Sequence, residues 1–376
     1  MRIAIFGIKT LPALAGADRV AERLIEHLPE HEYTIYLARD EGRSLTCSEH
    51  RHYVYVPVLR GKHLRAFSFF FLSVVHFLLR GDADVAHVHN SDFGLFCWIL
   101  KLKRRLAIVG TFHGRPYLRA KWGLGARLFL RLSEWAFARS CDVLTSVAPI
   151  DIAGMAIEVV ANGIEDQSAD RPSAFDYEGL QLSKDGYLLF ACGRLDATKG
   201  LHHLLRSYRA GDDPRKLLVI GDFNHDVKYS RMIEEKAAAD PRVVLFRSLV
   251  DRETLFDVIR QSALFVFPSE YEAMSMMLLE VIACRKIAVC SDIPENVAVL
   301  GADYPLFFQS ADQSSLAQAL TRARVPTEEL ERAVMASYAS AAARFRWDEI
   351  GRRYNALYRR AATEKFSALP AFGGGR

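Results

Sequence analysis

A short stretch in the second half of the chain, a strand followed by a helix, constrains the fold most. Residues 263–267 (ALFVF) have no polar face, which is typical of a parallel strand that is covered on both sides. After a turn, Ser275 can cap a helix over residues 276–284, in which every side chain except Glu280 is apolar. Helices of this kind cover parallel sheets, so the stretch predicts an α/β fold.

Two glutamates in this stretch have seven residues between them. Glu280 lies in the middle of the apolar helix, so its carboxylate must find hydrogen-bond donors inside the protein or on a ligand. The two adjacent hydroxyls of a ribose would satisfy it. Glu272 follows the strand at its carboxyl end, where open α/β sheets place their ligands. The alternative is an ordinary amphipathic helix with two surface acids.

The first half of the chain alternates short strands with helices, as in a doubly wound, mostly parallel sheet. We expect strands at residues 2–6, 34–37, 53–56, 85–89, 107–112, 143–145 and 158–160. We expect helices over residues 20–27, 64–79, 93–100 and 122–138. The composition then turns polar from residue 165 to residue 185, which we interpret as a domain boundary.

A second alternation follows this boundary. We expect strands at residues 187–191, 216–220, 243–246, 263–267 and 287–290. We expect helices over residues 201–208, 229–239, 251–261, 276–284, 314–323, 327–345 and 347–362. The predicted organisation is a first domain over 1–165, a linker over 166–186, a second domain over 187–345 and a disordered tail over 365–376.

The composition indicates a globular protein in a reducing compartment. Hydrophobic residues make up 50% of the chain and charged residues 25%, which excludes a disordered or acidic-tailed protein. The six cysteines show no Cys-x-x-Cys spacing, and no secretory leader precedes the first predicted strand, so we expect a cytoplasmic location. The longest apolar run, residues 66–79, has 14 residues and is too short to span a bilayer.

Positive charge is concentrated in one part of the chain. Residues 60–139 contain 14 Lys or Arg against four Asp or Glu, whereas the whole chain has a net charge of +4. Within this window, residues 118–139 interleave basic with aromatic and aliphatic side chains. This pattern is typical of a basic amphipathic helix on an anionic membrane, where each basic residue contributes roughly 1 kcal/mol. A solvated outer helix with a core stripe explains it equally well. No nucleic-acid-binding motif accompanies the charge, so we expect no nucleic-acid partner.

Six short motifs follow one another along the chain. They are AGADR at 15–19, TFHG at 111–114, VANGIE at 160–165, CGRLDATKG at 192–200, the Glu272–Glu280 pair, and FRW at 345–347. In this order, over roughly residues 1–360, they resemble the retaining GT-B glycosyltransferases of family 4 (glycosyl transferases group 1). The resemblance implies two Rossmann-like doubly wound domains that face each other across a cleft. It also implies that a helix over 346–364 crosses back to the first domain.

The resemblance implies an activity and roles for particular residues. A sugar would move from a nucleotide-diphosphate sugar to a glycan or lipid-linked acceptor, with retention, in surface polysaccharide biosynthesis. Arg194 and Lys199 would neutralise the leaving diphosphate without a metal ion or other cofactor. Glu272 would bind hydroxyls of the sugar and Glu280 the ribose. His113, after the strand at 107–112, would face the reacting carbon, although a capping or core histidine is the simpler alternative.

Further residues would line the donor. Gly16 matches a family glycine that lies beside the donor phosphates, and Gly193 lets the backbone approach a ligand. After Glu272 the family has Gly-Phe-Gly, whereas this chain has Ala273, Met274 and Ser275 before Met276. Their amides remain available, but with fewer backbone conformations than glycine allows. The resemblance therefore leaves the donor sugar and its base open.

Two other polar patterns point away from metal chemistry. His87 and His89 lie on the same face of the strand at 85–89, but the sequence offers no third ligand, so we interpret them as structural. Asp82 and Asp84 form an Asp-x-Asp pattern, which holds a divalent metal in other glycosyltransferases. Here the pattern precedes an interior strand, and so short a pattern is common by chance.

Two alternative functions remain open at this point. A nucleotide-sugar epimerase has a similar architecture and would release a rearranged sugar without any acceptor. A protein that binds nucleotide sugar and catalyses nothing is kept open by Ala273 and Ser275, although the presence of Lys199, Glu272 and His113 together argues against it. The association of Arg194 and Lys199 with the glutamate pair argues for the transferase.

Overall fold

The computed structural model describes residues 1–13, 16–39, 45–59, 61–115, 117, 123–152 and 154–367. The chain forms two compact units, each built on a parallel sheet. The first unit contains residues 1–162 and the C-terminal segment from Trp347, and the second contains residues 163–346. The predicted α/β fold, with two Rossmann-like units and a last helix that returns to the first unit, is confirmed.

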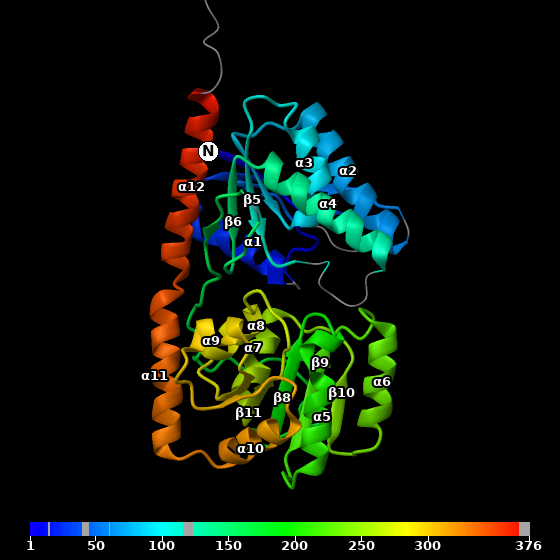
Figure 1. Cartoon of the computed structure of the whole chain (residues 1–376), viewed down its shortest axis with the longest axis vertical. Helices are drawn as coiled ribbons and strands as arrows, with labels where there is room; N and C mark the ends of the chain where they lie inside the picture. The colour runs from blue at the N-terminus through cyan, green and yellow to red at the C-terminus, as the bar shows by residue number, and fades with distance from the viewer. Residues whose placement is uncertain are drawn as a thin grey trace, which may run out of the picture. The chain divides into compact units, whose positions relative to one another are not determined.

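The first unit has a seven-stranded sheet in the order β3-β2-β1-β4-β5-β6-β7, in which all pairs are parallel. Its strands are β1 (Arg2–Phe6), β2 (Glu32–Ala38), β3 (Arg51–Val56), β4 (Val85–His89), β5 (Ala107–Phe112), β6 (Val143–Ser146) and β7 (Glu158–Val159). Its helices are α1 (Gly16–His27), α2 (Lys62–Arg80), the 3-10 turn η1 (Ser91–Phe93), α3 (Gly94–Leu100), α4 (Leu124–Ser140) and α12 (Trp347–Ser367). Figure 1 shows α2, α3 and α4 gathered in one layer of this unit.

The second unit has a six-stranded parallel sheet in the order β10-β9-β8-β11-β12-β13. Its strands are β8 (Tyr187–Cys192), β9 (Lys216–Gly221), β10 (Val243–Phe246), β11 (Leu264–Phe267), β12 (Ala288–Ser291) and β13 (Phe307–Phe308). Its helices are η3 (Ala197–Lys199), α5 (Leu201–Ala210), α6 (Val227–Ala237), α7 (Arg252–Gln261), α8 (Met276–Ala283), α9 (Pro294–Leu300), α10 (Gln313–Arg324) and α11 (Glu328–Arg344). The two short elements α9 and β13 were not predicted from the sequence pattern.

The order of the strands reverses direction once in each sheet, between β1 and β4 and between β8 and β11. Ligands of open α/β sheets bind outside the carboxyl ends of the strands at such a switch point. In the second unit the loops at this point begin after Cys192 and after Phe267. Both loops carry residues that the sequence analysis assigned to the donor.

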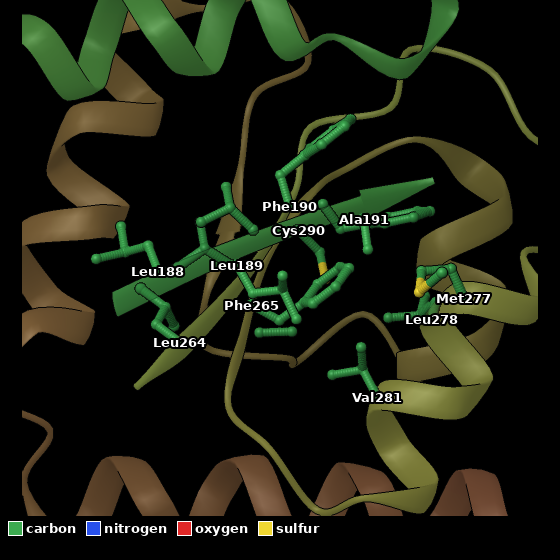
Figure 2. Close-up of a cluster of buried hydrophobic side chains, with 14 of the residues drawn as sticks. Leu188, Leu189, Phe190, Ala191, Leu264, Phe265, Met277, Leu278, Val281 and Cys290 are labelled. Atoms are coloured by element: carbon green, nitrogen blue, oxygen red, sulfur yellow. The ribbon is translucent and has the colours of Figure 1, made fainter. Parts of the chain in front are cut away.

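The core of the second unit explains why these strands read as apolar runs. Leu188, Leu189 and Phe265 on the two central strands are buried, as are Leu278 and Val281 on α8 (Figure 2). A fully buried side chain of this size contributes about 1.5–3 kcal/mol to folding. The predicted burial of both the strand and the helix is confirmed.

The prediction of a linker over 166–186 is wrong, because this segment packs on the second unit. The buried carboxylate of Asp257 accepts hydrogen bonds from the amide and hydroxyl of Ser173, at 2.9 and 2.6 Å, and from Tyr177 Oη at 3.0 Å. These bonds fix a stretch that looks like a linker by composition. The tail predicted to be disordered from 365 is helical as far as Ser367. Residues 368–376 lie outside the described part of the chain.

Candidate functional site

Lys199 and Glu272 come together at the switch point of the second sheet. Lys199 lies in the loop after β8, and its Nζ atom donates to Glu272 Oε1 at 2.6 Å. The hydroxyl of Ser269, in the loop after β11, donates to the same oxygen at 2.9 Å. The side chains of Lys199 and Glu272 are mostly buried, so the pair is shielded from water and its attraction is stronger than on a surface.

The two loops that carry this pair are joined through their backbones. The amide of Glu270 donates to the carbonyl of Thr198 at 2.8 Å. Gly200 ends η3 with φ +68°, and a Cβ atom there would lie 1.9 Å from the carbonyl oxygen of Pro268. Asp196 caps η3 by accepting from the amide of Thr198 at 3.0 Å. The chain therefore needs glycine at position 200 for the loops to approach this closely.

Glu280 lies in the apolar helix α8, which follows the loop that carries Glu272. Its side chain is 4% exposed, as expected for a carboxylate in the middle of a buried helix. Ser275 caps α8, as predicted, by accepting from the amide of Leu278 at 3.4 Å. The amides that open α8 give it a partial positive charge at this end. Ala273, Met274 and Met276 are half-buried around this helix start.

Gly193 and Arg194 lie in the loop that leads from β8 to Lys199. Gly193 is half-buried and Arg194 is exposed. Segments of the second unit therefore hold Gly193, Arg194, Lys199, Glu272, Ala273, Met274, Ser275, Met276 and Glu280. His113 and Gly16 belong to the first unit.

His113 follows β5 and takes part in a hydrogen-bonded group of histidines. Its Nε2 atom lies 2.9 Å from His89 Nδ1, on β4. His87, on the same strand, bonds Tyr358 Oη and Thr111 Oγ1, each at 2.7 Å. Burial lowers the pKa of His113 to about 4 and that of His87 to about 3, so both imidazoles are neutral at pH 7. Among the described residues, no group of potential metal ligands includes these histidines.

The partners of His89 indicate which nitrogens carry protons. His89 Nε2 is buried, and within the described residues it has no hydrogen-bond partner. A buried N–H without an acceptor is rarer than a buried acceptor without a donor, so the proton of His89 belongs on Nδ1. His89 then donates to His113 Nε2, and the proton of His113 lies on Nδ1. His113 therefore offers a ligand a hydrogen-bond donor. The sequence pattern alone did not reveal this role of His89.

Gly16 is the first residue of α1, so its amide belongs to the unsatisfied first turn of a helix. The buried carboxylate of Asp18 accepts from the amides of Lys9 and Thr10, at 3.1 and 3.2 Å, and fixes the loop after β1 against this helix. Ala15, from the same motif, lies outside the described residues. Asp82 and Asp84, the Asp-x-Asp pattern that the sequence analysis attributed to chance, both form ion pairs with Arg2.

Two family models match the chain. The model described as Glycosyltransferase Family 4 matches residues 14–167, and the model described as Glycosyl transferases group 1 matches residues 174–339. Between them they match most of both structural units.

Curated relatives are about a quarter identical to the chain over the residues that align. One is the UDP-Gal:alpha-D-GlcNAc-diphosphoundecaprenol alpha-1,3-galactosyltransferase of Escherichia coli, which is 23% identical over 85% of this chain and 88% of its own length. Another is the alpha-maltose-1-phosphate synthase of Mycolicibacterium smegmatis, which is 24% identical over 57% of this chain and 62% of its own length.

Solved structures share the fold of the whole chain. The sucrose-phosphate synthase of Thermosynechococcus elongatus superposes with a TM-score of 0.77 at 19% identity, over 98% of this chain and 100% of that one. An E. coli trehalose-6-phosphate enzyme bound with UDP-2-fluoro glucose gives a TM-score of 0.70 at 13% identity, over 96% of this chain and 99% of that one. These structures and the two parallel-sheet units show the GT-B fold, and the two family models, which together match most of the chain, show that it is a glycosyltransferase that belongs to glycosyltransferase family 4 (glycosyl transferases group 1).

Proposed function

We propose that the protein transfers a sugar from a nucleotide-diphosphate sugar to a lipid-linked or other glycan acceptor, with retention of the anomeric configuration. The observation that carries this proposal is the Lys199–Glu272 contact of 2.6 Å at the switch point of the second sheet. It holds a cation for a leaving diphosphate next to a carboxylate for sugar hydroxyls. Glu280, buried nearby in α8, would bind the ribose.

In this proposal the protein supplies charge and position rather than a covalent intermediate. Lys199 and Arg194 stabilise the negative charge that builds on the diphosphate as the glycosidic bond breaks, without a metal ion. The acceptor hydroxyl attacks from the face that the diphosphate leaves, and the diphosphate takes its proton. Glu272 already accepts from Lys199 and Ser269, which suits a carboxylate that orients the sugar. His113 Nδ1 would donate to the sugar.

The acceptor class is supported by a relative and by one surface of the first unit. The name of the E. coli relative states that its acceptor is a sugar linked to diphosphoundecaprenol, which is a lipid. No helix among residues with a described structure is long and apolar enough to cross a bilayer. From the lipid-linked acceptor of that relative, we propose that the protein acts at the cytoplasmic face of the plasma membrane, in surface polysaccharide biosynthesis.

Exposed apolar side chains on the outer face of α4 support this membrane contact. Leu124 is 87% exposed, Leu128 71% and Trp135 45%, and Leu132 is also exposed. Arg131 and Arg139 are exposed on the same face. The ring of Trp135 packs against that of the exposed Trp98 of α3, with 5.5 Å between the ring centroids, and this pair extends the apolar surface. Apolar side chains flanked by arginines suit the boundary between headgroups and acyl chains of an anionic membrane. Residues 118–122 of the predicted basic segment lie outside the described residues.

The donor and the product test the transfer reaction. The purified protein would be titrated with a panel of nucleotide sugars, alongside Lys199→Ala and Glu280→Ala. We expect one donor to bind selectively, with weaker binding in both variants, and the linkage of the product to keep the donor's anomeric configuration by NMR. An inverted product would exclude retention. A free rearranged sugar would indicate an epimerase, and binding without turnover would indicate a non-catalytic protein.

Vesicles test the membrane contact separately. We expect the protein to sediment with vesicles that contain anionic lipid and not with neutral ones, and Leu128→Ser to weaken this binding. Val325→Ser is the matched control, because Val325 is 80% exposed in the second unit, away from the basic window. Equal binding of the two variants and the parent would exclude α4 as the contact surface.

A further inference from the structure

Three side chains outside the proposed donor contacts converge at the same switch point. His202 and His203 lie in the first turn of α5, and Glu270 lies in the loop after β11. His203 Nε2 is 3.1 Å and His202 Nε2 is 3.9 Å from Glu270 Oε1. One potential ligand atom from each of the three residues lies within 4.8 Å of the others. The family motifs in the sequence did not draw attention to these residues.

Neighbouring groups hold two of the three in place, His202 and Glu270. Tyr229 Oη lies 2.9 Å from His202 Nδ1, so the Nε2 atom of this ring is directed to Glu270. The hydrogen bond from the amide of Glu270 to Thr198 fixes the start of the loop against the neighbouring one. An imidazole that bonds an oxygen through one nitrogen and presents the other is the usual arrangement of a metal-ligating histidine.

The spacing of the cluster fits a small tetrahedral site. Zinc binds histidine nitrogen and carboxylate oxygen at about 2.0–2.2 Å, which places the ligand atoms of a tetrahedral site about 3.4 Å apart. The two measured separations, 3.1 and 3.9 Å, lie on either side of this value.

We propose that His202, His203 and Glu270 bind a divalent transition-metal ion of the zinc type. Two imidazoles and one carboxylate suit such an ion and do not suit magnesium, which prefers oxygen ligands. The ion would tie the start of α5 to the loop after β11. Lys199 directly precedes α5, and Glu272 lies in the loop after β11. The metal would therefore brace the contact between them without entering the transfer step. Metal binding at this site does not require that the proposed sugar transfer be correct.

The test uses untagged, metal-free full-length protein that carries Cys47→Ser, because the exposed thiol of Cys47 could bind metal by itself. Calorimetry with Zn²⁺ should give one ion per chain, and Co²⁺ should give the visible absorption bands of a four-coordinate ion. We expect His203→Ala and Glu270→Gln to abolish binding. Tyr229→Phe should weaken it by about 10- to 100-fold, because it removes the partner that orients His202.

Two comparisons keep the result unambiguous. His52→Ala removes an exposed histidine of the first unit and should leave binding unchanged. Glu270→Gln keeps the shape of the side chain, so the melting temperature of this variant without metal should equal that of the parent protein. Absence of saturable binding, or binding that survives both His203→Ala and Glu270→Gln, would overturn the proposal. Neither readout depends on turnover, so failure here leaves the sugar-transfer proposal untouched.

Discussion

The two units differ in where their polar side chains lie relative to the sheet. In the first unit, His87 and His89 on β4 and Thr111 on β5 are fully buried within the sheet layer. In the second, β8 and β11 are buried and apolar throughout, and the polar groups lie in the loops after them. Buried polar groups need partners, and α12 supplies them to the first sheet through Tyr354 and Tyr358.

This difference has consequences for stability and for activity. The interior of the first unit depends on hydrogen bonds whose donors and acceptors titrate. The central strands of the second sheet, β8 and β11, depend on apolar packing, which does not respond to pH. Mutations in the loops of the second unit should therefore change activity with little effect on folding.

The largest expected effect is on catalysis, from Lys199→Ala. Loss of one positioned donor to a developing negative charge lowers kcat by about 10²- to 10³-fold. Glu272 keeps its bond from Ser269, so the fold should persist. Steady-state kinetics and the melting temperature would be measured together. Lys228→Ala, at an exposed position of α6, is the matched control. A similar loss of kcat in both variants would remove the special role of Lys199.

Acid should loosen the first sheet before the second. His87 has a pKa of about 3 in the folded protein and takes up a proton near pH 6.5 once unfolded. Protonation of His87 in the unfolded state does not affect stability above pH 6.5. Below pH 6.5 it lowers the free energy of unfolding, by about 3 kcal/mol at pH 4.5. Burial lowers the pKa of His89 in the same direction.

Hydrogen exchange measures this difference strand by strand. Between pH 7 and pH 4.5, corrected for intrinsic exchange, amides of β4 and β5 should lose protection before those of β8 and β11. The second unit has one comparable histidine, His202, but it lies at the start of a helix beside the sheet. Simultaneous loss of protection in both sheets would contradict the distinction.

Glu280→Gln should give an intermediate effect on donor affinity. A hydrogen bond to a charged group contributes about 1.5–3 kcal/mol, so we expect the Kd for the nucleoside diphosphate to rise by about 10- to 100-fold. Glutamine has the same shape, and the packing of α8 should be retained. Glu235→Gln, at an exposed position of α6, serves as the control. An unchanged Kd in Glu280→Gln would show that the carboxylate does not contact the ligand.

The smallest expected effect is on the stability of the second unit, from Ser275→Ala. Loss of this helix cap should lower the free energy of unfolding by about 1 kcal/mol, as measured by urea denaturation. Ser275→Thr keeps a capping hydroxyl and should lie close to the parent. If alanine and threonine behave alike, the cap contributes nothing, and the amides of α8 are fixed by packing alone.

Local patterns in the sequence predicted most elements of both sheets within a few residues. They failed for β13, which has two residues, and for α9, whose seven residues carry no clear apolar period. They failed again at 166–186, because polar composition does not reveal that Ser173 and Tyr177 bond the buried Asp257. Basic residues around α4 indicated a surface, but the exposure of Leu124 and Leu128 on its outer side required the fold.

The sequence by itself determined the two alternating halves, the burial of α8 around Glu280 and the family, because periodicity and motif spacing are local properties of a chain. Only the tertiary structure brought Lys199 within 2.6 Å of Glu272, 73 residues later. It also joined His89 to His113 and placed His202 and His203 beside Glu270. Such contacts depend on which strands become neighbours at a switch point, and strand order is settled by packing of the whole unit.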